Sequence, residues 1–152
     1  MEVNQSVFNE FPVLKTKRLT LRPLTLNDAD AIYKMRASGR VNEFIPRPAL
    51  SELEQSKELV EKTIQAYNKR TGIAWAGILR DKGDIIGTCG FNQFDFQNLR
   101  AEIGGELNVD YWGKKIPLEL VSAIVKFGFD TMNLHTIEAK VSPNNRGAIY
   151  LL

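Results

Sequence analysis

A glycine and two lysines lie where a predicted strand gives way to a predicted helix. Gly113, Lys114 and Lys115 fall between a strand expected over residues 101–109 and a helix expected to begin near Pro117. Backbone N–H groups at a helix N-terminus attract anions, and the lysines add positive charge. These residues therefore suit a phosphate or pyrophosphate, although they also suit a plain solvated turn. Neither the Walker motif nor the dinucleotide fingerprint is present, so the segment is not a loop of those two kinds.

Two acidic residues occupy the strand before this loop. Because successive side chains of a strand point to opposite faces, Glu102, Gly104, Glu106 and Asn108 share one face. A carboxylate on such a face could take a proton from an attacking nucleophile, which makes Glu102 and Glu106 candidate general bases. The alternative for each is a solvated charge on a half-exposed strand.

The single cysteine and the single histidine argue against other chemistries. One of each excludes an internal disulfide and an ordinary zinc cluster, so no metal site is predicted. Cys89 lies within a predicted strand with no base at a recognisable spacing, which favours an inert buried thiol over a nucleophile. His135 begins a strand, and we expect it to serve packing or hydrogen bonding.

The elements that must position these residues alternate between helical and extended periods. Strands are expected over residues 18–24, 73–79, 85–94, 101–109 and 134–141, and helices from Asn27, over 51–69 and from Pro117. Short polar turns join the three consecutive strands, so hairpins are predicted there. The pattern predicts a mixed α+β fold.

Composition predicts one soluble domain. The chain has 152 residues, 43% hydrophobic and 25% charged, with a net charge of +2. Such a balance gives no support to a nucleic-acid or membrane partner, and the polar N-terminus is unlike a signal peptide, so a cytoplasmic location is expected. The last residues, 148–152, stop within a helical pattern. We therefore expect residues 1–152 to form a single domain that lacks its last helix end and a C-terminal hairpin, with an exposed sheet edge that could pair in a homo-oligomer.

Several motifs in order resemble one enzyme family. They lie at 18–24, 86–88, 102–104, 111–114, Glu119, 127–129, 134–139 and Asn145. Together they resemble the GCN5-related N-acetyltransferase (GNAT) superfamily, and within it the ribosomal-protein N-acetyltransferase (RimJ/RimL-type) subfamily. The resemblance implies an acyl-CoA N-acyltransferase fold, a mostly antiparallel twisted sheet with helices on both faces.

The resemblance also implies where acetyl-CoA binds. Backbone groups of Leu107, Asn108 and Val109 would line the pantetheine and polarise the thioester. The pyrophosphate would be held by the loop amides of Trp112, Gly113, Lys114, Lys115, Ile116 and Pro117. Asn145 would reach the pantetheine arm. Glu119 matches a frequent family position, and we expect it to tie down the loop or the helix.

The chain departs from the family pattern at four positions. Lys115 replaces a glycine that permits close backbone approach, and Pro117 replaces a small residue and removes an N–H donor. Lys115 would either obstruct the phosphate or form an ion pair with it. Ala148 and Leu152 lack hydroxyls that many family members have there.

Two functions follow from these patterns. The first is an N-acetyltransferase that transfers the acetyl group of acetyl-CoA to a primary amine by direct attack, the donors for the carbonyl oxygen being backbone N–H groups. The acceptor would be a protein N-terminal α-amine, as on a ribosomal protein, or a small amine such as a polyamine. The alternative is a non-catalytic binding or regulatory module of the same fold with a weakened CoA site.

Overall fold

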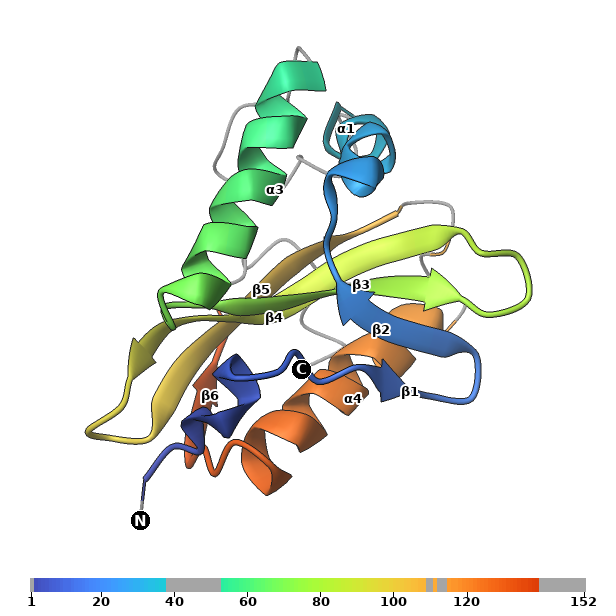
Figure 1. Cartoon of the computed structure of the whole chain (residues 1–152). Helices are drawn as coiled ribbons and strands as arrows, with labels where there is room; N and C mark the ends of the chain where they lie inside the picture. Colours follow the sequence, from blue (N-terminus) through green and yellow to red (C-terminus); the bar gives the residue numbers. More distant parts are fainter. Residues whose placement is uncertain (1, 38–52, 109–110, 112–114, 140–152) are drawn as a thin grey trace.

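A six-stranded sheet runs through the molecule, and helices lie on both of its faces (Figure 1). The structure, a computed structural model, describes residues 2–37, 53–108, 111 and 115–139. The strands are β1 (Leu14–Lys15), β2 (Leu19–Pro23), β3 (Ile73–Leu79), β4 (Ile85–Asp95), β5 (Arg100–Leu107) and β6 (Thr136–Glu138). They lie side by side in sequence order, antiparallel from β1 to β5, and β6 is parallel to β5.

Three α-helices and two short 3-10 helices are described. They are η1 (Gln5–Phe8), η2 (Leu26–Asp28), α1 (Ala29–Ala37), α3 (Leu53–Asn68) and α4 (Ile116–Asp130). Helices α1 and α3 cover one face of the sheet, and α4 covers the other (Figure 1). None of the described helices is long and apolar enough to cross a membrane.

The face under α4 carries the larger hydrophobic core. Trp75 is fully buried there, and its ring lies 5.3 Å from that of Phe127 on α4. The Trp75 indole N–H donates to the carbonyl of Pro12 at 2.7 Å, so its polar atom is satisfied. Trp75 and Phe94 are therefore core residues, of which Phe94 is partly buried against this cluster.

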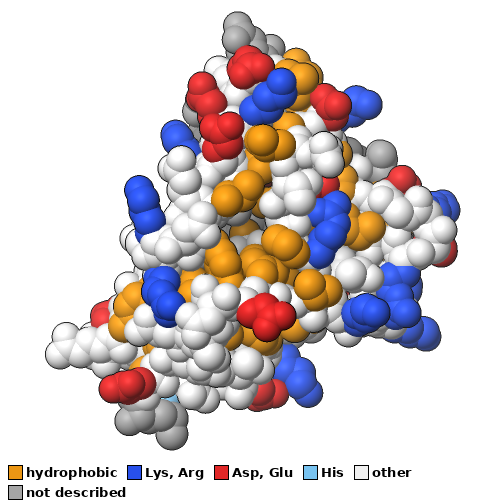
Figure 2. Space-filling view, in the orientation of Figure 1, with side chains coloured by type: hydrophobic (Ala, Val, Ile, Leu, Met, Phe, Trp, Pro, Cys, Tyr) orange, Lys and Arg blue, Asp and Glu red, His pale blue; other side chains and the backbone are white. Residues whose placement is uncertain are grey.

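The face under α1 and α3 carries a smaller core. Leu24, Ile32, Val60 and Ala76 form it. The hydroxyl of Ser56, fully buried on α3, donates to the carbonyl of Ala29 at 2.6 Å and joins the two helices. Hydrophobic side chains gather in the middle of the view in Figure 2, between these helices and the part of the molecule below them, and charged side chains lie around this apolar area.

The predicted α+β fold with a mostly antiparallel sheet and helices on both faces is confirmed. The strand expected over 101–109 ends at Leu107, and the described part of the one expected over 134–141 is Thr136–Glu138. Strand β1 was not predicted, because a strand of two residues has too few positions to show alternation.

Candidate functional site

The two candidate bases lie on the face of β5 that is turned toward α1 and α3. Glu106 pairs with Thr88 of β4, and that row continues through Ala76, a member of the core under these helices. Glu106 is only 8% exposed, whereas Glu102 is half-buried. The shared face predicted from the alternation is therefore present, but the two carboxylates lie in different surroundings.

Gly104 leaves an open position between these two carboxylates. A Cβ added at Gly104 would meet no described atom within 4 Å, whereas one added at the next residue, Gly105, would lie 2.0 Å from the carbonyl oxygen of Thr88. Gly105 thus permits the close approach of β4 and β5. Gly104 keeps one face of β5 free of side-chain bulk where a substrate could approach.

Strand β5 pairs with the described residues of β6 over its first three residues. The parallel ladder joins Arg100–Glu102 to Thr136–Glu138, while β5 continues to Leu107. An ion pair of 3.5 Å between Arg100 and Glu138 lies at the paired end. The residues that follow Ala139 in the chain lie outside the described residues.

The end of β5 sets the direction of its backbone polar groups. The Asn108 N–H donates to the carbonyl of Ile86 at 2.7 Å, and the Asn108 carbonyl accepts from the N–H of Tyr111 at 3.0 Å. Because neighbouring residues of an antiparallel strand direct their N–H and C=O groups to opposite sides, those of Leu107 point away from β4. The family resemblance implies that backbone groups of Leu107, Asn108 and Val109 polarise the thioester. Among the described residues of this set, Leu107 has backbone groups that point away from β4.

The start of α4 has an unusual backbone. Lys115 precedes the helix with φ 63° and ψ 0°, the left-handed region that favours glycine. No described side chain caps this helix end, and Pro117 lies in the first turn, where its missing N–H removes one of the unpaired donors. Lys115 thus has a backbone conformation that glycine adopts without strain.

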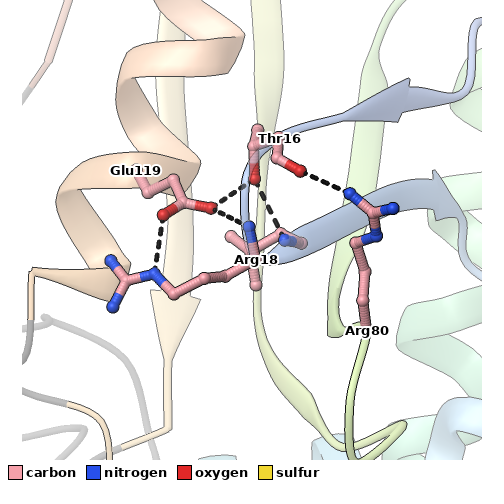
Figure 3. Close-up of polar contacts among 5 residues, drawn as sticks. Thr16, Arg18, Arg80 and Glu119 are labelled. Atoms are coloured by element: carbon pink, nitrogen blue, oxygen red, sulfur yellow. Dashed lines mark hydrogen bonds and ion pairs between the residues drawn. The ribbon is translucent and has the colours of Figure 1, made fainter.

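Glu119 ties this helix start to the turn between β1 and β2 (Figure 3). One of its carboxylate oxygens accepts from the Thr16 hydroxyl and from the Arg18 N–H, the latter at 2.9 Å, and the other accepts from Arg18 Nε at 2.8 Å. Burial disfavours the ionised carboxylate, but these hydrogen bonds outweigh it and lower the pKa of Glu119. The expectation that Glu119 has an anchoring role is confirmed by these contacts.

Thr16 was not singled out in the sequence, although Arg18 lies in a motif. Nothing in the local pattern of Thr16 indicates a contact with a residue 103 positions away. Only the fold brings the turn and the helix together.

Other candidate residues have structural surroundings or fall outside the described part of the chain. Burial raises the pKa of Cys89 to about 12, so its thiol is not a nucleophile at neutral pH. His135 is exposed, and its backbone N–H donates to the carbonyl of Leu99 at 2.7 Å. Among the described residues no three His, Cys, Asp or Glu side chains gather as a metal site would require. The predicted ligands Val109, Trp112, Gly113, Lys114 and Asn145 lie outside the described residues.

Known proteins are similar to this chain in sequence and in fold. The acetyltransferase (GNAT) domain family matches residues 18–152. The uncharacterized N-acetyltransferase p20 of Bacillus licheniformis is 34% identical over 139 residues, which cover 91% of this chain and 78% of the relative. The crystal structure of a GNAT-family acetyltransferase from Bacillus anthracis superposes with a TM-score of 0.80 at 25% identity, covering 92% of this chain and 80% of that one.

A more distant neighbour was solved with coenzyme A. RimL, a ribosomal alpha-N-protein acetyltransferase, matches with a TM-score of 0.82 at 14% identity, over 92% of this chain and 80% of that one. At that identity the likeness concerns the fold alone. The family match and the p20 relative carry the assignment: the chain belongs to the GCN5-related N-acetyltransferase (GNAT) family and is an N-acetyltransferase.

Proposed function

We propose that the chain transfers the acetyl group of acetyl-CoA directly to a primary amine, without a covalent enzyme intermediate. The observation that carries this proposal is the end of β5. There an open position at Gly104 lies on the same face of the strand as a buried carboxylate at Glu106. An amine on this face and a thioester along the strand edge could meet at one point, which is what direct attack requires.

Glu106 is the proposed general base, in preference to Glu102. The two residues are four positions apart in one strand, so their Cα atoms are separated by about 13 Å and cannot serve the same amine. Glu106 is buried and directly precedes Leu107, whose backbone points toward the proposed thioester site, and Glu102 lies beside Glu138 of β6. The carboxylate of Glu106 would take the proton of the attacking amine, and the CoA sulfur would leave as a thiolate.

The phosphates of acetyl-CoA are proposed to bind at the start of α4. The support is the position of Lys115, which directly precedes the N-terminus of α4 in a left-handed conformation. Its exposed ammonium group then adds a positive charge to the uncapped helix end formed with Ile116 and Pro117. The non-catalytic alternative rests on the departures at Lys115, Pro117, Ala148 and Leu152 taken together, of which the last two lie outside the described residues.

The proposed acceptor is a protein N-terminal α-amine. The support is the neighbouring ribosomal-protein acetyltransferase structures, which share the fold. A small amine such as a polyamine is the other outcome of the same assay. The balanced charge and single cysteine are typical of a cytoplasmic enzyme, which is the proposed location.

The test is titration of acetyl-CoA into the 152-residue chain, followed by turnover. Micromolar binding, together with thiol release that depends on a peptide N-terminus or a polyamine, is the expected result. Binding without turnover on any peptide or polyamine would favour the non-catalytic module. No binding would contradict the proposed function.

A further inference from the structure

Asp28 and Glu119 each lie in the first turn of a helix, and their carboxylates have different partners. Asp28 stabilises its own helix start: one of its oxygens accepts from the Thr25 N–H at 2.8 Å, and both accept from the Arg22 guanidinium at 2.8 and 2.9 Å. Glu119 of α4 instead bonds to Thr16 and Arg18, which belong to another part of the fold. The start of α4 is therefore held from outside the helix.

The turn that holds Glu119 is itself fixed at several points. The Thr16 hydroxyl also accepts from the Leu19 N–H at 3.0 Å, which closes the turn between β1 and β2. Arg80 donates from its guanidinium to the Thr16 carbonyl at 2.9 Å and from its backbone N–H to the Arg18 carbonyl at 2.9 Å (Figure 3). A rigid turn bonded to both carboxylate oxygens can fix the position of the helix end.

The contact with Glu119 is adjacent to the unusual backbone of α4. The N–H of Glu119 donates to the carbonyl of Lys115 at 3.1 Å, so the anchored residue closes the first turn that Lys115 opens. A left-handed residue costs free energy and persists only where surrounding contacts hold it. The anchor on Glu119 is one such contact.

Arg18 gives the anchor an electrostatic role as well. A carboxylate in the first turn would repel an anion bound at the helix end, although it favours the helix dipole. The Arg18 guanidinium lies 2.8 Å from Glu119 and is 41% exposed, so it compensates this charge. The start of α4 thus keeps its attraction for anions despite Glu119.

We infer that Glu119 is a positioning residue for the phosphates of acetyl-CoA, acting through Thr16 and Arg18 on the first turn of α4. The inference rests on the proposed function, because it assumes that the phosphates bind at this helix end. The phosphates are remote from the reacting carbonyl, so a displaced helix end weakens binding and leaves the chemical step intact.

The experiment compares two acetyl donors. Glu119→Gln keeps the side-chain size but cannot accept all three hydrogen bonds. Thr16→Val, the second variant, removes one of the three and also the bond from the Leu19 N–H. With acetyl-CoA we expect the KM to rise about tenfold in Glu119→Gln and less in Thr16→Val, with kcat changed less than about twofold. With S-acetylpantetheine, which has no pyrophosphate, kcat/KM is expected to stay unchanged.

Asp28→Asn is the matched control, since it breaks a second arginine–carboxylate pair at a helix start, that of Asp28 with Arg22. It is expected to lower the melting temperature without changing the KM for acetyl-CoA. If the two Glu119-site variants changed both donors equally, or lowered the melting temperature alone, Glu119 would be only a structural residue. A wild-type chain that fails to bind CoA would contradict the proposed function as well, whereas a wild type that binds and variants that match it contradict only this inference.

Discussion

The two faces of β5 differ in the burial and in the type of the side chains that they carry. Toward α4, Ala101 and Ile103 are buried in the larger core, and Ile103 pairs with Phe91 of β4. Toward α1 and α3, the same strand presents Glu102, an open position at Gly104, and Glu106. Adjacent residues of β5 therefore differ: one set is buried in the core, and the other lies on the face with the acidic side chains.

The difference separates the side chains that hold the sheet from those proposed to act on a substrate. The apolar face stabilises the fold through burial, which scales with the area removed from water. The other face has no side chain at Gly104 and a buried carboxylate at Glu106, and neither feature improves packing. Substitutions on the first face should change the free energy of unfolding, and those on the second should change kinetics.

The largest expected effect is in the larger core, on the face of the sheet under α4. Trp75→Ala removes a fully buried ring and its hydrogen bond to Pro12, which should cost about 4 kcal/mol of the free energy of unfolding. Urea denaturation measures it. Trp75→Phe, which keeps most of the ring contacts, should cost less than half as much. A Trp75→Ala chain as stable as the wild type would place Trp75 outside the core.

Glu106→Gln should have the next largest effect, on catalysis. Without the carboxylate no strong base takes the proton of the amine, and we expect kcat to fall about a hundredfold, equivalent to about 2.7 kcal/mol. The decrease should be smaller at high pH, where more of the amine is already neutral. Glu102→Gln is the matched control and should retain activity within about twofold. If the two variants exchanged these results, Glu102 would be the base.

A side chain at Gly104 should obstruct the acceptor. Gly104→Leu places bulk in the open position, and we expect the KM for the amine to rise about tenfold, equivalent to about 1.4 kcal/mol, with the melting temperature little changed. Gly105→Ala should instead lower the melting temperature, because its Cβ would lie 2.0 Å from the Thr88 carbonyl oxygen and strain the sheet. Unaltered kinetics in Gly104→Leu would show that the acceptor binds elsewhere.

Much of the fold could be predicted from local patterns. Alternation predicted β3 to the residue, and period-two geometry placed Glu102 and Glu106 on one face, since both depend only on neighbours in the chain. The anchoring role of Glu119 was expected from the family resemblance. Its partners could not be predicted, because Thr16 and Arg18 meet it only when α4 covers the sheet.

The difference between Glu102 and Glu106 was also beyond the sequence. The alternation makes them equivalent, and only the ladder shows that the described residues of β6 pair beside Glu102. Burial of Glu106 depends in the same way on elements distant in the chain. Long-range pairing therefore decides which of two equivalent carboxylates is the better base candidate.

The smallest expected effect is at Lys115, where the chain passes from β5 to the helix on the opposite face. Lys115→Gly keeps the backbone at φ 63° without a Cβ, so we expect the free energy of unfolding to rise by about 1 kcal/mol. The same substitution removes a positive charge, so the affinity for CoA should fall about threefold if the ammonium group pairs with a phosphate. Thermal melts and CoA titration measure the two effects separately, and Lys115→Asn, which tolerates this conformation, controls for the charge. Tighter CoA binding in Lys115→Gly would instead show that the lysine obstructs the phosphate, and the proposed ion pair would be wrong.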